Sequence, residues 1–139
     1  MVVFIIRGRR GDIMKILSVD DSAIIRKIIR SAVEVLGYDL SEASEGMEAL
    51  AVLEENYENT ELILLDWNMP GMNGLEFLEK VKKDSRFRNI PVMMVTTESE
   101  RENIVKAIQA GAKHYMTKPF TTEDIIKRIL ECLGRGDGF

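Results

Sequence analysis

Acidic side chains, a hydroxyl and an ammonium group stand directly after short apolar runs in this chain. Asp20 and Asp21 follow the first such run, and Asp66 follows the third. Thr96 closes the fourth run, and Lys118 comes just after the fifth. Carboxylates gathered at one place repel one another and raise at least one pKa, and a hard cation with oxygen ligands, such as Mg²⁺, relieves that repulsion. With Lys118 and Thr96 as donors for an anion, the set predicts phosphoryl transfer with Asp66 as the nucleophile.

The spacing of apolar residues predicts alternating strands and helices. Strands are expected over residues 14–19, 40–43, 62–65, 91–96 and 113–117, and helices over 22–36, 46–56, 75–81, 104–110 and 122–133. Ser22 and Thr122 are the expected caps of the first and last helix, and Ile24, Met47 and Ala51 are expected to face inward. This alternation implies a parallel sheet with right-handed crossovers, which is a three-layer α/β sandwich. Ligands of such sheets bind beyond the carboxyl ends of the strands, where the polar residues stand.

Length and composition exclude several classes of protein. The 139 residues carry a net charge of −4, 45% of them are hydrophobic, and Cys132 is the only cysteine. We expect one folded domain over 14–134, an upstream extension over 1–13 that is flexible or has a non-native start, and a frayed tail over 135–139. The acidic balance argues against nucleic-acid binding, and no apolar run approaches the ~18 residues of a membrane span. A lone cysteine excludes a disulfide framework and favours the cytoplasm.

Four short motifs stand in order at the ends of the predicted strands. They are Val19-Asp-Asp-Ser22, Leu65-Asp-Trp-Asn-Met-Pro70, Met94-Val-Thr96 and Tyr115-Met-Thr-Lys-Pro-Phe120. Each motif alone is weakly specific, but together they resemble the receiver domains of two-component response regulators, from about Lys15 to Leu133. The Asp-Trp-Asn-Met-Pro string is similar in particular to the CheY-like, single-domain regulators of chemotaxis.

The resemblance implies a flavodoxin-like fold with five parallel strands in the order 2-1-3-4-5 and five helices. It implies that Asp66 accepts a phosphoryl group from a phosphohistidine of a sensor histidine kinase. Asp21, Asp66 and the backbone carbonyl of Asn68 would bind Mg²⁺, or Mn²⁺ in its place, and Asp20 would act mainly through a bound water. Lys118 would contact the phosphoryl oxygens.

The resemblance also implies a switch. Thr96 would move toward the phosphoryl group, Tyr115 would fill the vacated space, and the peptide bond before Pro119 would be cis. The expected partner face is more basic than the chain as a whole and suits an acidic amphipathic segment; it comprises Arg101, Ile104, Ile108, Lys113, Tyr115, Lys127 and Arg128. The implied partners of this monomer are a flagellar motor switch protein and a phosphatase.

Four residues either depart from the pattern of the resembling proteins or stand at positions that tune their rates. Asn68, Thr97 and Glu98 stand where relatives set the rates of phosphoryl gain and loss. Thr97 is bulkier than the residue often found beside the acceptor, so we expect slow phosphorylation by small donors. Asn73 replaces an aspartate common in the loop before Gly74, and we expect little chemical effect from this change.

Other functions remain open. A stand-alone receiver could serve as a phosphorelay intermediate or a phosphate sink, and in each case it catalyses only its own phosphorylation and dephosphorylation. A small Mg²⁺-dependent phosphatase of the haloacid-dehalogenase type normally has a second aspartate two residues after the nucleophile, where this chain has Asn68. A flavodoxin-like flavin carrier needs a Ser/Thr/Gly-rich phosphate loop after the first strand, and Asp20 and Asp21 stand there instead.

Overall fold

The computed structural model describes residues 13–97 and 101–134. Its elements are β1 (Lys15–Val19), α1 (Ala23–Leu36), β2 (Asp39–Ala43), α2 (Gly46–Asn56), the 3₁₀ turn η1 (Tyr57–Asn59), β3 (Thr60–Leu65), α3 (Gly74–Lys83), β4 (Val92–Thr96), α4 (Arg101–Gln109), β5 (His114–Thr117) and α5 (Thr122–Cys132). The predicted tail over 135–139, and all of the predicted extension except Ile13, lie outside the described residues.

One parallel sheet runs through the centre of the molecule in the order β2-β1-β3-β4-β5, which confirms the predicted topology. Val19, the last residue of β1, is level with Leu65, the last residue of β3. Leu65 is in turn level with Met94 of β4. The residues that follow β1 and β3 therefore leave the sheet side by side at its middle.

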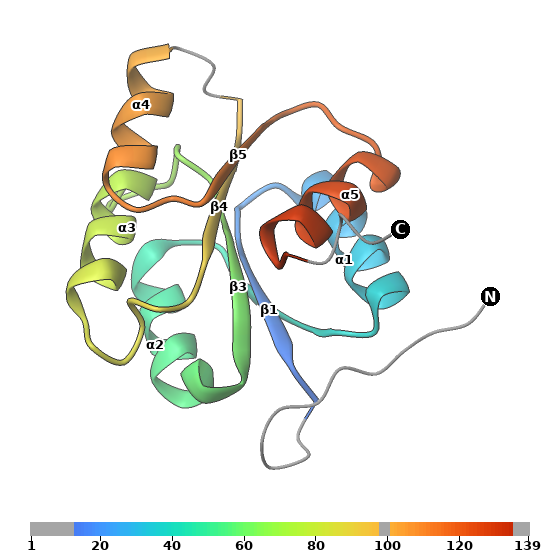
Figure 1. The fold of residues 1–139 in the computed structure, drawn as a ribbon, viewed down its shortest axis with the longest axis horizontal. Coiled ribbons are helices and arrows are strands. Elements are labelled where there is room, and N and C mark those ends of the chain that lie inside the picture. The colour runs from blue at the N-terminus through green and yellow to red at the C-terminus, as the bar shows by residue number, and fades with distance from the viewer. Residues whose placement is uncertain (1–12, 98–100, 135–139) are drawn as a thin grey trace.

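Helices cover both faces of the sheet (Figure 1). Helices α1 and α5 lie on one face, and α2, α3 and α4 lie on the other. Successive strand residues point to opposite faces, so Leu17 and Ile63 join the core under α2, α3 and α4, whereas Ile16 and Leu62 join the core under α1 and α5. All four side chains are fully buried, as expected for a strand with helices on both sides.

Side chains and glycine define the helix ends. The Ser22 hydroxyl accepts from the Ile25 N–H, as predicted, and Gly37 ends α1 at a φ of 80° that favours glycine. The prediction that Thr122 caps α5 is wrong by one residue. Thr121 is the cap, because its hydroxyl accepts from the Asp124 N–H while the Asp124 carboxylate accepts from the Thr121 N–H.

Three residues predicted to face inward are exposed. Ile24 and Met47 have 73% and 63% of their surface accessible. Both are the second residue of a helix, and the buried side of that helix runs through other residues: Ile25 and Ile29 in α1, and Gly46, Ala49 and Leu53 in α2. Ala51 is exposed because the buried side of α2 runs through Ala49 and Leu53, and residues two apart point about 200° away from each other around a helix.

Candidate functional site

The backbone holds three of the predicted site residues at one edge of the sheet. The Asp20 N–H donates to the Ala43 carbonyl at 3.0 Å, and the Asp66 N–H donates to the Val19 carbonyl at 3.0 Å. Each bond continues the sheet by one residue past the end of β1 or β3. The N–H of Lys118 likewise donates to the carbonyl of Thr96 at 2.9 Å, beyond β5. Backbone hydrogen bonds therefore fix the positions from which these polar side chains extend.

The side chains of these residues converge. Carboxylate oxygens of Asp20, Asp21 and Asp66 all lie within 4.8 Å of one another. The Lys118 Nζ lies 2.7 Å from Asp20 Oδ2 and 3.5 Å from Asp66 Oδ2. Asp20 and Asp66 are buried, whereas Asp21 is exposed to solvent. The cluster is thus shielded from solvent at Asp20 and Asp66 and open to solvent at Asp21.

Burial raises the pKa of the Asp20 carboxyl above its ordinary value. Hydrogen bonds from Lys118 and from the Ser22 N–H, at 2.7 and 2.9 Å, oppose this rise. The charge of Asp66 also raises the pKa of Asp20, but it is the smallest of the causes. Repulsion between carboxylates, which the sequence argument put first, is therefore secondary to the removal of Asp20 from water.

The donor set fits a hard divalent cation. Three carboxylates face one ammonium, so the cluster keeps an excess of negative charge. All three acids offer oxygen atoms, the ligands that Mg²⁺ prefers, and the exposed Asp21 leaves room for the waters that this ion retains. Asp20, Asp21 and Asp66 would hold the ion. The Asn68 backbone lies beside them, since its N–H approaches Asp66 Oδ1 at 3.4 Å.

The loop from β3 to α3 is packed against Asp66 through Gly74, a role that could not be read from the sequence alone. A Cβ added at Gly74 would lie 2.3 Å from the Asp66 carbonyl oxygen and 2.8 Å from the Trp67 Cα, and neither backbone atom can move freely. Asn73 next to it caps α3 by accepting from the Glu76 N–H at 2.9 Å. Asparagine thus serves here as a helix cap.

The residues assigned to the switch lie around the same edge. Thr96 is fully buried at the end of β4, and Tyr115 of β5 is half-buried against the core under α2, α3 and α4. The Lys118–Pro119 peptide bond is cis. Thr97 is exposed, while Glu98 lies outside the described residues.

The predicted partner face spans α4, β5 and α5. Ile104, Tyr115 and Arg128 are half-buried there, and the exposed members are Arg101, Ile108, Lys113 and Lys127. Two of its cations are engaged within the chain, because Lys113 Nζ donates to the Cys132 carbonyl at 2.5 Å and Arg128 pairs with Glu131 at 3.4 Å. Val105, 43% exposed, adds an apolar side chain to α4 that the sequence reading left out; its helical spacing from Ile108 was the available signal.

A model of the response regulator receiver domain matches residues 16–130 of the chain. The chain belongs to the response regulator receiver family. The chemotaxis protein CheY1 of Helicobacter pylori is 43% identical to this receiver over 125 residues, which cover 89% of this chain and 100% of the relative. The resemblance inferred from the four strand-end motifs is thereby confirmed.

Solved structures agree with this family. The chemotaxis regulator CheY4 of Vibrio cholerae matches with a TM-score of 0.79 and 34% identity, over 86% of this chain and 98% of the other. The Mn²⁺-bound form of the response regulator Rcp1 matches with a TM-score of 0.70 and 27% identity, over 87% and 90%. No helix in the described part of this receiver is both long and apolar enough to cross a membrane.

Proposed function

We propose that this receiver accepts a phosphoryl group on Asp66 from a phosphohistidine of a sensor histidine kinase. The observation that carries the proposal is the meeting of three carboxylates with the Lys118 ammonium at one edge of the sheet. A nucleophile, a place for a divalent cation and a fixed positive charge are the parts that phosphoryl transfer needs.

The transfer forms one bond and breaks one. A carboxylate oxygen of Asp66 attacks the phosphorus, the P–N bond of the phosphohistidine breaks, and the leaving imidazole keeps the electron pair and takes a proton from water. Lys118, whose Nζ is 3.5 Å from Asp66 Oδ2, donates to an oxygen of the incoming group. Asp20, Asp21, Asp66 and the Asn68 carbonyl would hold Mg²⁺, Asp20 mainly through a water, and the bound ion would supply positive charge for the phosphoryl oxygens.

The switch follows from the charge that arrives. The new dianion stabilises the arrangement in which the Thr96 hydroxyl and Lys118 both reach it. Movement of the buried Thr96 leaves space into which Tyr115 turns, and Tyr115 belongs to the partner face defined above. Phosphorylation thereby changes the surface of α4, β5 and α5 that a target protein binds.

A role in chemotaxis is supported by the relatives, since the Helicobacter pylori and Vibrio cholerae proteins are both named as chemotaxis proteins. We therefore propose a flagellar motor switch protein as the target, a phosphatase as a further partner, and the cytoplasm as the site of action. The same chemistry would serve a phosphorelay intermediate or a phosphate sink, and the target alone separates these roles.

Intact-mass measurement after incubation with Mg²⁺ and acetyl phosphate tests the proposal. We expect the wild type to gain one phosphoryl group, Asp66→Asn to gain none, and Asp39→Asn, an exposed aspartate on β2, to behave as the wild type. Thr97→Ala is included because Thr97 slows small donors in our proposal. Phosphorylation of Asp66→Asn would overturn the assignment of Asp66 as the phosphoacceptor. Failure of both the wild type and Thr97→Ala to gain a phosphoryl group would overturn it as well.

A further inference from the structure

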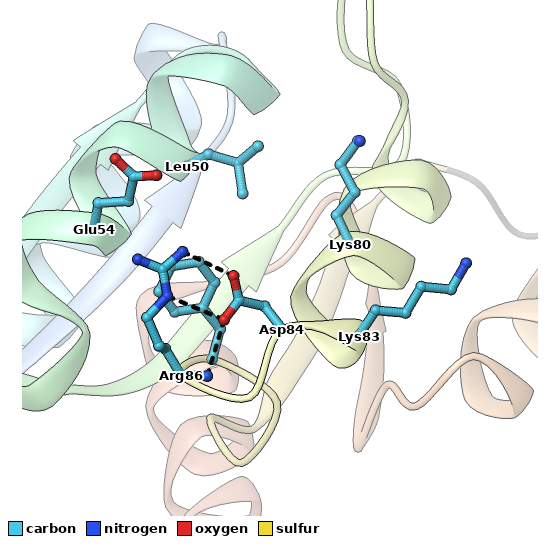
Figure 2. Close-up of a pocket in the computed structure, with 7 residues that line it drawn as sticks. Leu50, Glu54, Lys80, Lys83, Asp84 and Arg86 are labelled. Carbon is cyan, nitrogen blue, oxygen red and sulfur yellow. Dashed lines mark hydrogen bonds and ion pairs between the residues drawn. The ribbon is translucent and has the colours of Figure 1, made fainter.

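A hollow of about 400 Å³ lies between α2 and α3 (Figure 2). Its residues come from the middle and the end of α2, the last turn of α3 and the segment that leads to β4: Leu50, Glu54, Lys80, Lys83, Asp84, Arg86 and Phe87. The helices of this fold run opposite to the strands, so their last turns lie at the other end of the sheet from Asp66. The hollow is therefore separate from the phosphorylation site.

The centre of the hollow is apolar and has no net charge. Phe87 is buried and the Arg86 guanidinium lies 4.6 Å above its ring. Arg86 is held there by the Asp84 carboxylate, through bonds of 3.1 Å from Nε and 2.8 Å from Nη2. Leu50, half-buried, stands on the α2 side. Arg86 therefore covers Phe87, and the alkyl part of Arg86 and the Leu50 side chain form the apolar surface of the hollow.

The α3 wall carries two free cations. Lys80 and Lys83 are exposed, and neither has an ion pair or side-chain hydrogen bond within the residues that the structure describes. Figure 2 shows both ammonium groups extending away from the Asp84–Arg86 pair. Glu54 is the acidic residue on the α2 wall, so the charge of the hollow is basic on one side and acidic on the other.

We propose that this hollow is a second docking site, which takes an acidic peptide segment with one large apolar side chain. The apolar side chain rests on Leu50 and on the alkyl part of Arg86, and glutamate or aspartate side chains of the segment reach Lys80 and Lys83. Charge complementarity selects this occupant, because a basic segment would meet the two lysines with like charge. The site lies apart from α4, β5 and α5, so its partner binds whether or not Asp66 is phosphorylated.

Titration of the ¹⁵N-labelled full chain with a short peptide tests this site. The probe is a capped hexapeptide of three glutamates, two leucines and one phenylalanine, and its control replaces every glutamate with glutamine. We expect saturable shifts of the backbone amides of residues 50–54 and 80–87. We expect the dissociation constant to rise about fivefold when Lys83→Glu replaces the wild type or when the glutamine peptide replaces the probe. This is the effect expected from the loss of an exposed ion pair.

Two comparisons make the result decisive. Lys27→Glu reverses an exposed lysine on α1 and should leave the affinity unchanged, and so should Asp66→Asn. Shifts confined to residues 101–128 would mean that the peptide binds only the α4, β5 and α5 surface, and the second site would be rejected. Equal affinity of the two peptides, equal affinity of Lys83→Glu and wild type, or no saturable shift would reject it as well.

Discussion

The Lys118 ammonium lies 2.7 Å from the carboxylate of Asp20, a residue 98 positions away in the chain. Both side chains are largely withdrawn from solvent, with 11% and 3% of their surface exposed. Lys118 is closer to Asp20 than to Asp66, for which the distance is 3.5 Å. This lysine therefore compensates the buried Asp20 first and Asp66 second.

Removal of that ammonium should destabilise the receiver. Lys118→Met leaves Asp20 buried without its closest positive charge, and we expect a loss of about 1–3 kcal/mol in the free energy of unfolding. Urea denaturation in EDTA measures the loss, with Lys27→Met as the control for an exposed lysine. An unchanged free energy of unfolding for Lys118→Met would show that the Lys118–Asp20 pair contributes no stability.

The exposed acid of the cluster should affect Mg²⁺ binding more than folding. In EDTA, we expect Asp21→Asn to be at least as stable as the wild type, because it removes one of three crowded negative charges. Mg²⁺ should stabilise the wild type by about 1.4 kcal/mol at ~10 times its dissociation constant, and should stabilise the variant far less. Thermal unfolding with and without Mg²⁺ measures both, beside Glu55→Gln on α2. A full Mg²⁺ effect in Asp21→Asn would remove Asp21 from the ligand set.

The raised pKa of Asp20 predicts a pH dependence of metal-free stability. As the pH falls, the Asp20 carboxyl takes up a proton in the folded protein first. In the unfolded chain the same carboxyl takes up a proton only near its ordinary pKa of 3.8. Its contribution to stability therefore increases as the pH falls through the folded-state pKa toward 3.8, and it decreases as the pH rises through the folded-state pKa.

Comparison of the wild type with Asp20→Asn in EDTA isolates this contribution. The stability of the wild type relative to the variant should increase as the pH falls through that window. Asp84 and Asp124 have lowered pKa values, because of hydrogen bonds from Arg86 and Thr121, so their contributions are lost only below 3.8. A difference between wild type and variant that stays constant with pH would contradict the raised pKa of Asp20.

Gly74 is expected to tolerate no larger residue. In Gly74→Ala the new methyl group meets the backbone of Asp66 and Trp67, and we expect a loss of about 2 kcal/mol together with slower phosphorylation. Gly46 is a matched control, since it is also the first residue of a helix but faces the flexible Met72 side chain, with the sulfur at 2.9 Å. Equal losses in denaturation for the two variants would argue against a tight contact at the acceptor loop.

Much of the fold and of the site could be predicted from the sequence because two local patterns coincide. The uninterrupted apolar run of residues 62–65 indicates a strand buried on both faces, and the alternation of strands with helices restricts the sheet to a parallel arrangement. Polar residues that follow such strands must meet at one edge. Asp20, Asp66 and Lys118 could therefore be grouped before any distance was known.

Other features depend on tertiary contacts that no local pattern contains. Ile24 and Met47 fit a helical apolar stripe, but the side of each helix that is buried runs through other residues. The preference of Lys118 for Asp20 over Asp66 depends on the side-chain conformations at the site. Gly74 could be recognised only as part of a turn, since its closeness to the Asp66 backbone arises from the path of the whole loop.

Trp67, half-buried beside the acceptor and packed on the core under α2, α3 and α4, provides the most direct test of phosphorylation at Asp66. Its fluorescence would be followed while Mg²⁺ and then acetyl phosphate or phosphoramidate are added to wild type and to Asp66→Asn. We predict a change on adding Mg²⁺ and a second, donor-dependent change that the variant lacks. A donor-dependent change of the same size in Asp66→Asn would contradict Asp66 as the phosphoacceptor.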